Sequence, residues 1–122
     1  LEDELNVRLE SGMPVFGMNL KVYQRKGEYG RQYIIPVGRL DLLCEDTAGN
    51  LYVVELKKDS GYDDAYEQTA QYLEWFEKSE KFKGKKVYGI ICLNNPTKEL
   101  ISRVHNDKRM RLFEYRISYT EL

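Results

Sequence analysis

The sequence predicts an α/β domain in which helices flank a central mixed sheet. Segments with the two-residue period of strands alternate along the chain with segments at helical spacing. The run KVYGIICL at 86–93 is almost continuously apolar, which is typical of a strand covered on both faces. With 122 residues, 42% of them hydrophobic and 32% charged, the chain fits a single domain, residues 1–122, with one core. The expected order is α-β-β-β-α-β-α-β.

The first third of the chain is expected to form a helix and a strand region. Residues 2–11 carry Leu5 and Leu9 four positions apart in an otherwise charged segment, which indicates an amphipathic helix. Residues 19–33 are rich in β-favouring side chains around a turn region at 27–30. They indicate a hairpin, or a strand with a loop.

Two apolar runs follow, at 38–45 and 51–57, and the turn-rich spacer between them has the length of a hairpin connection. We therefore expect these runs to be neighbouring antiparallel strands. The next segment, 63–79, repeats apolar and aromatic residues at helical spacing and predicts the main helix. Asp64 and Glu67 are spaced like a capping box at its start.

After the apolar run at 86–93, the pattern is helical at 97–106. Residues 111–119 alternate and indicate a closing strand. One face of that strand would carry Phe113, Tyr115, Ile117 and Tyr119.

Composition limits the kinds of partner and compartment. The chain has 19 Lys and Arg against 20 Asp and Glu, a net charge of -1, so no bulk basicity points to nucleic acid. No apolar run approaches the ~20 residues that cross a bilayer, and the N-terminal sequence lacks the features of a signal peptide. We expect a cytoplasmic protein without a membrane partner, and the absent initiator Met suggests a piece of a longer protein.

The cysteines and the histidine do not form a metal-binding pattern. Cys44 and Cys92 each lie within an apolar run, which indicates free, buried thiols. His105 is the only histidine and lies in a polar helical segment, which favours a surface position.

Charged side chains lie where a purely structural strand pair would carry apolar ones. The two-residue period puts Glu55 and Lys57 on one face of their strand, and a short hairpin can bring Asp41 beside Glu55. In the strand of Asp41, alternation would place Leu40 and Leu42 together on the opposite face. Adjoining carboxylates repel each other unless a cation with oxygen preference lies between them. The pattern indicates a Mg²⁺ site, with Lys57 able to hold a water or stabilise charge on a phosphoryl group.

These residues also have a plain structural explanation. Asp, Glu and Lys on a hairpin most often form an exposed salt bridge, although Glu55 follows two valines in a strand expected to be half-buried. Gln68 and Tyr72 put an amide and a phenol on the helix face that should pack on the sheet. There, Gln68 would be a satisfied core amide or a boundary residue.

The combined motifs resemble those of the PD-(D/E)XK nuclease superfamily, and within it are most similar to the nuclease domain of NucS-type endonucleases. The matching strings are Gly38-Arg39-Leu40-Asp41-Leu42-Leu43, Glu55-Leu56-Lys57, and Gln68 with Tyr72. Leu40 stands where the superfamily name has Pro. The resemblance implies a restriction-endonuclease-like core and a Mg²⁺- or Mn²⁺-dependent endonuclease that hydrolyses DNA phosphodiester bonds.

The resemblance also implies residue roles. Metal ligands would be Asp41, Glu55 and a glutamate of the first helix, for which Glu2 fits best and Glu4 and Glu10 are alternatives. The catalytic set would be Asp41, Glu55, the catalytic lysine Lys57, and the supporting helix pair Gln68 and Tyr72.

Partner expectations follow from the uneven placement of basic residues. Clusters lie near 21–31, 78–86 and 103–111 and would contact phosphates if they flank the site, or else form solvated faces. The residues expected at DNA are Arg31, Arg39 and Lys58. A homodimer or an additional domain would complete DNA binding. The alternative functions are a catalytically inactive nuclease-like module that binds nucleic acid or a protein, and a plain scaffold with surface ion pairs.

Overall fold

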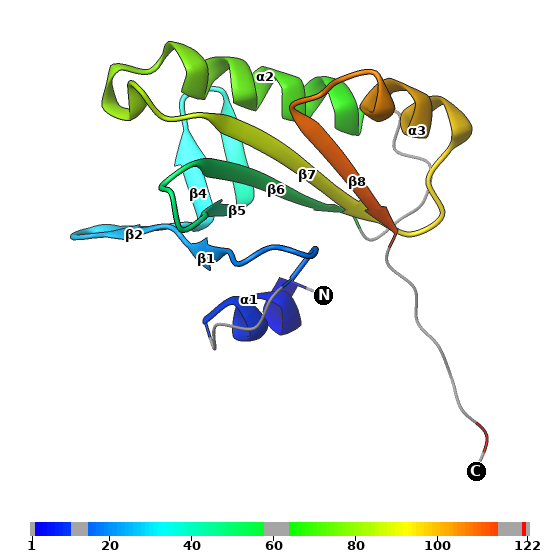
Figure 1. The fold of residues 1–122 in the computed structure, drawn as a ribbon, viewed down its shortest axis with the longest axis horizontal. Helices are drawn as coiled ribbons and strands as arrows, with labels where there is room; N and C mark the ends of the chain where they lie inside the picture. Colours follow the sequence, from blue (N-terminus) through cyan, green and yellow to red (C-terminus); the bar gives the residue numbers. More distant parts are fainter. Residues whose placement is uncertain (1, 11–14, 58–63, 115–120, 122) are drawn as a thin grey trace.

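The computed structural model describes residues 2–10, 15–57, 64–114 and 121. Their central feature is a mixed sheet with helices on both faces (Figure 1). This is the class of fold that the sequence predicts. Within the described residues, no helix is long and apolar enough to cross a membrane.

The main sheet contains both antiparallel and parallel pairs. Its strands are β1 (Lys21–Val22), β4 (Arg31–Ile35), β5 (Gly38–Glu45), β6 (Leu51–Lys57), β7 (Val87–Leu93) and β8 (Met110–Glu114). The order is β1-β5-β6-β7-β8, and β4 pairs with β5 outside this path. β5 is antiparallel to β1, β4 and β6, whereas β7 is parallel to β6 and β8. A small separate sheet pairs β2 (Gln24–Arg25) with β3 (Glu28–Tyr29).

The helices cover opposite faces of this sheet. They are α1 (Glu2–Glu10), α2 (Ala65–Lys78) and α3 (Lys98–His105), and the short 3-10 turn η1 (Glu80–Phe82) follows α2. Figure 1 shows α2 and α3 on one face and α1 on the other. The strand pair that carries the predicted catalytic residues therefore lies between two helical layers.

The sheet separates two apolar cores. Leu73 and Ile91 belong to the core under α2 and α3, and Leu9 and Ile90 belong to the core over α1. Neighbouring residues of β7 serve different cores because successive side chains of a strand point to opposite faces. This explains the continuous apolar run at 86–93 and confirms that it forms a central strand covered on both faces.

Other expected elements are also confirmed. The antiparallel strands at 38–45 and 51–57 have the predicted bounds, and the helices at 2–11, 63–79 and 97–106 agree within two residues. Leu5 and Leu9 are buried, Cys44 and Cys92 are buried free thiols, and His105 is exposed. The expected closing strand corresponds to β8. Its predicted residues Tyr115, Ile117 and Tyr119 lie outside the described residues.

The region 19–33 differs from the expectation of a hairpin or a single strand with a loop. It forms four short strands, β1 to β4, so the element order has more strands before α2 than predicted. Gly27 has a φ of 80° in the turn between β2 and β3, and Gln32 has a φ of 52° within β4. A positive φ departs from the extended conformation, which is why the strands here are short or irregular.

The predicted capping box at the start of α2 is wrong. Asp64 is the N-cap residue, but its side chain makes no capping hydrogen bond. Its φ of -75° and ψ of -6° are helical, whereas a capping residue normally has extended backbone that directs its side chain at the first-turn amides. Instead, the backbone oxygen of Asp64 accepts from the amide of Gln68 at 3.0 Å.

Candidate functional site

The candidate site lies where β5 and β6 part. Their register pairs Leu42 with Val54, and Asp41 and Glu55 are the next residues on each strand. The side chain of Asp41 turns to β6, where its Oδ2 accepts a hydrogen bond from the backbone N of Leu56 at 2.7 Å. The backbone N–H of Leu56 thus donates to a side-chain carboxylate, where a regular strand pair would have a backbone carbonyl as acceptor.

The faces of β5 change at Asp41. Leu40 and Leu43 both belong to the core under α2, whereas Leu42 belongs to the core over α1. The expectation that Leu40 and Leu42 share a face is therefore wrong. The register of β5 with β4 skips Asp41, which lies opposite Gln32 with its φ of 52°, and this irregularity interrupts the regular alternation of side chains.

Glu55 carries a buried carboxyl group, one oxygen of which accepts no hydrogen bond from the described residues. The residue is 2% exposed, and its Oε1 has no hydrogen-bond partner within the described part of the chain. Burial, followed by the adjacent charge of Asp41, raises the pKa of Glu55 to about 9. Without a bound cation, this environment therefore favours the protonated form of Glu55.

Lys57 and α2 complete the polar cluster. Lys57 lies two residues beyond Glu55 on β6, and its Nζ donates to Oε1 of Gln68 at 2.8 Å. Tyr72 lies one turn further along α2 and is buried. Burial, then the charge of Glu55, raises the pKa of Tyr72, while a hydrogen bond to Gln68 opposes the shift. Gln68 is therefore a satisfied amide that also fixes the lysine.

Gly38 is a site residue that the motif contains but that the sequence argument gave no role. A Cβ at this position would lie 2.6 Å from the hydroxyl oxygen of Tyr72, and φ is 155°. Only glycine permits both the backbone conformation and the close approach. The signal in the sequence is a glycine at the first position of a strand, three residues before Asp41.

The first-helix glutamates make contacts with other side chains. Glu2 accepts from Nε of Arg31 at 2.8 Å and from Nε2 of Gln32 at 2.6 Å. Glu4 is exposed and forms an ion pair with Arg8. No group of three acidic, histidine or cysteine side chains suited to a metal occurs among the residues that the structure describes. Glu2 as a third ligand remains a prediction.

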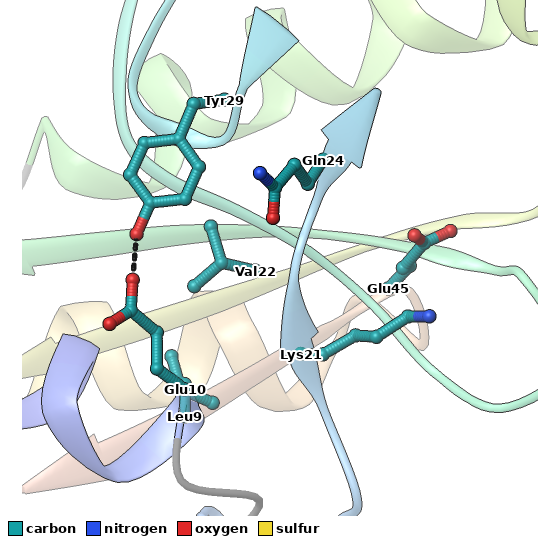
Figure 2. A pocket seen from close by; sticks show the side chains of 7 residues that line it. All are labelled: Leu9, Glu10, Lys21, Val22, Gln24, Tyr29 and Glu45. Carbon is teal, nitrogen blue, oxygen red and sulfur yellow. Dashed lines mark hydrogen bonds between the residues drawn. The ribbon is translucent and has the colours of Figure 1, made fainter. Parts of the chain in front are cut away.

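Glu10 faces a different cavity. Figure 2 shows it in a pocket between α1, β1 and β3, where it accepts a hydrogen bond from the hydroxyl group of Tyr29. The pocket has a volume of about 430 Å³. Its lining residues are Leu9, Glu10, Lys21, Val22, Gln24, Tyr29 and Glu45. None of the proposed catalytic residues lines it.

The three basic residues expected to contact DNA differ in their surroundings. Arg39 is exposed near the start of β5. Arg31 forms ion pairs with Glu2 and Asp3. Lys58 lies outside the described residues.

Many other basic side chains of the predicted clusters are also paired with acids. The pairs are Arg25–Glu45, Lys78–Glu74, Lys81–Glu28, Arg103–Glu67 and Arg109–Asp107. These ion pairs neutralise much of the positive charge that the sequence clusters suggest.

Comparisons with known proteins agree on one family. The family model described as "Endonuclease NucS C-terminal domain" matches residues 25–115. A search of curated proteins found no match. Among solved structures, a crystal structure of a repair endonuclease from Pyrococcus abyssi has a TM-score of 0.68 at 20% identity over 92% of this chain.

Two further solved structures are similar in fold. One, described as an EndoMS-dsDNA2 complex, has a TM-score of 0.68 at 19% identity over 96% of this chain. The other, EndoMS in apo form, has a TM-score of 0.52 at 22% identity over 62% of it. The chain spans 45% of the length of the Pyrococcus abyssi protein and 44% and 34% of the lengths of these two chains. With most of its length matched by the family model, the chain belongs to the endonuclease NucS C-terminal domain family.

Proposed function

We propose that this chain is a nuclease domain of the PD-(D/E)XK type that hydrolyses DNA phosphodiester bonds with Mg²⁺ or Mn²⁺. The observation that carries the proposal is the pair formed by half-buried Asp41 and buried Glu55, which lies beside Lys57 where two strands part. Support also comes from the similar structures, of which one is described as a repair endonuclease and another as a complex with double-stranded DNA.

The residues of the pair suit a hard divalent cation. Both side chains offer carboxylate oxygens, which Mg²⁺ and Mn²⁺ prefer as ligands. Oε1 of Glu55 is buried and has no partner among the described residues, and an unsatisfied buried acceptor is costly. A cation between the two carboxylates would satisfy this oxygen and remove their repulsion.

The proposed mechanism assigns a task to each side chain. Asp41 and Glu55 would hold the cation, which would supply an activated water and offset the charge that builds on the phosphoryl group. Lys57 would offset the negative charge of the phosphate, and its hydrogen bond to Gln68 holds the ammonium group in position. Tyr72 keeps the Gly38 end of β5 in place through their close contact.

The test is cleavage of a panel of duplex, branched and mismatched DNA with Mg²⁺ or Mn²⁺. Asp41→Ala and Lys57→Ala should each reduce the rate by at least about 100-fold, since each removes a charge that acts on the reacting group. Lys83→Ala is the matched control, because this exposed lysine lies beyond the end of α2 that is remote from Gln68. Equal cutting by the Ala variants and the parent would refute the assignment.

A second candidate function is a nuclease-like module that binds nucleic acid or a protein without cutting. The ion pair of Glu2 with Arg31 favours it, because this contact engages the first-helix carboxylate expected at the metal. Calorimetry with Mn²⁺ separates the two functions. Millimolar or tighter binding that Asp41→Ala abolishes supports the nuclease, whereas absence of binding by the parent supports the inactive module.

A further inference from the structure

A second, smaller pocket combines aromatic and basic side chains. It has a volume of about 190 Å³, and residues of β6, β7 and β8 contribute to its walls. The aromatic and charged residues that line it are Tyr52, Tyr88, Lys108, Arg109 and Arg111. None of the described residues that line this pocket is acidic, and none belongs to the candidate site.

The pocket lies on the opposite face of the sheet from Glu55. Ile90, which also lines the pocket, is buried in the core over α1. Tyr88 lies two residues before Ile90 on β7 and therefore shares its face. The parallel register pairs Tyr88 with Tyr52, and it pairs Ile90 with Arg111. All four side chains are thus on the α1 face, whereas Glu55 lies an odd number of residues from Tyr52 and is on the α2 face.

Tyr52 and Tyr88 provide an aromatic surface that is held in place. Their ring centroids are 5.2 Å apart, with an interplanar angle of 29°. The hydroxyl group of Tyr52 donates to Oδ2 of Asp46 at 3.1 Å, which fixes the orientation of the pair. Tyr52 covers one face of the half-buried Tyr88 ring, and the pocket extends from Tyr88 toward Arg111 on the neighbouring strand. A planar group in the pocket can therefore stack on Tyr88, as nucleobases do on aromatic side chains.

Two cations beside this ring are not neutralised. Lys108 and Arg111 are exposed and form no ion pair within the described part of the chain. Arg109, by contrast, pairs with Asp107. The guanidinium carbon of Arg111 lies 5.0 Å from the centroid of the Phe113 ring, a contact that leaves its N–H donors available. Lys108 and Arg111 therefore give the pocket a positive charge.

The size and charge of the pocket together indicate its ligand. Its volume of about 190 Å³ is below the ~300–1,000 Å³ typical of sites for drug-sized molecules. The pocket therefore suits one planar ring system rather than a base pair. Lysine and arginine donors are suited to phosphate oxygens. An aromatic ring beside two unpaired cations is thus complementary to a base that carries a phosphate.

We propose that this pocket binds a nucleoside phosphate, with the base stacked on Tyr88 and the phosphate held by Lys108 and Arg111. β8 is the last strand of the main sheet, so the pocket lies at an edge of the sheet. A free nucleotide and a nucleotide within a DNA single strand present the same base and phosphate. The inference goes beyond the proposed nuclease function, because it concerns a separate site and involves no metal ion.

The test is calorimetry in a low-salt buffer that contains EDTA. The probes are deoxyadenosine monophosphate, a short oligodeoxyadenylate and inorganic phosphate. Tyr88→Leu removes the ring but keeps an apolar side chain, and Arg111→Gln removes one charge. The matched controls are Tyr29→Leu and Lys98→Gln, which change an exposed tyrosine and an exposed lysine outside the pocket.

The parent should bind deoxyadenosine monophosphate with a dissociation constant of about 1 mM or tighter, and inorganic phosphate more weakly. Tyr88→Leu should weaken nucleotide binding about tenfold, because the stacking contact is lost. Arg111→Gln should weaken it about fivefold and reduce its dependence on salt. Both controls should bind as the parent does. Tighter binding of the oligodeoxyadenylate would support a site for a strand, and equal affinity per nucleotide would support a site for free nucleotides.

Three results would overturn the proposed pocket ligand. The first is no nucleotide binding by the parent, and the second is nucleotide binding that neither Tyr88→Leu nor Arg111→Gln weakens. The third is equally tight binding of inorganic phosphate, which would identify an anion site without recognition of the base. Nucleotide binding that Lys57→Ala abolishes and Tyr88→Leu retains would belong to the candidate site instead.

Further variants separate binding from folding and from cleavage. Tyr88→Phe keeps the ring and should bind nucleotide as the parent does. If circular dichroism shows that Tyr88→Leu does not fold, Lys108→Gln and Arg111→Gln, both at exposed positions, carry the test. Asp41→Ala should bind nucleotide in EDTA as the parent does, so a failure of the nuclease proposal and a failure of this one give different results.

Discussion

At the scale of single residues, the site depends on groups whose role is set by burial. Glu55 has an ordinary strand position in the sequence, and alternation correctly places it with Lys57 on the side of α2. What alternation does not give is the 2% exposure and the unpartnered Oε1, because both depend on how α2 and β5 pack around it. The requirement for glycine at position 38 is equally invisible to alternation, because it comes from the close approach of the Tyr72 ring.

The raised pKa of Glu55 predicts a pH-dependent stability in metal-free buffer. In the unfolded chain this carboxyl group loses its proton near 4.5, whereas in the folded chain it keeps the proton up to about 9. The folded state therefore binds more protons across this window, and its stability falls as the pH rises from about 4.5 to 9.

Glu55→Gln removes this titration while keeping a similar shape. The variant should unfold at about the same denaturant concentration as the parent near pH 4.5 and should gain more than about 1 kcal/mol over it by pH 8. Denaturation with EDTA present measures the difference. Glu99→Gln, an exposed position in α3, serves as control and should show no such trend. A gain that is independent of pH would contradict the buried, protonated state of Glu55.

At the scale of elements, sequence patterns work where a regular element faces one environment. The strands β5 and β6, the central strand β7 and the helix α2 follow from periodicity and turn residues with nearly correct bounds. The patterns fail where tertiary partners change. The pairing of β5 with β4 is interrupted at Asp41, and the region 19–33 breaks into strands too short to have a period. The capping box predicted for α2 does not form, because Asp64 has a helical backbone conformation and its side chain makes no capping hydrogen bond.

Packing of α2 on β7 provides a prediction at this scale. A Cβ at Gly89 would lie 2.8 Å from Cγ2 of Thr69, so Gly89→Ala should destabilise the fold by about 1–3 kcal/mol. Thr69→Ser removes the clashing methyl group. In a double-mutant cycle by chemical denaturation, the pair should show a favourable coupling above about 0.5 kcal/mol. Additive effects would mean that the helix moves freely away from the strand.

At the scale of the whole molecule, the distribution of charge limits DNA binding. The net charge is -1, and ion pairs occupy basic residues from each of the three sequence clusters. The pair of Arg103 in α3 with Glu67 in α2 could not be predicted from the sequence because the two residues come from different elements, whereas Lys78 and Glu74 are four residues apart in one helix. The matched structures are more than twice as long as this chain.

This charge balance predicts weak, salt-sensitive binding by the chain alone. Fluorescence anisotropy with a short duplex should give a dissociation constant above about 10 µM at physiological salt, and the affinity should rise as the salt is lowered to ~50 mM. Nanomolar affinity that is insensitive to salt would contradict this balance of charges.

The hydrogen bond between Oδ2 of Asp41 and the amide of Leu56 restricts how the carboxylate can coordinate. One lone pair of Oδ2 is committed to the backbone, so Oδ1 is the oxygen better placed to take another ligand. Under the proposed function, Asp41 would coordinate through a single oxygen, and the geometry would favour a small octahedral ion. Ca²⁺, which takes more ligands and often binds both oxygens of a carboxylate, fits such a site less well than Mg²⁺ does. The integrity of the sheet and the choice of cation would thus depend on the same side chain.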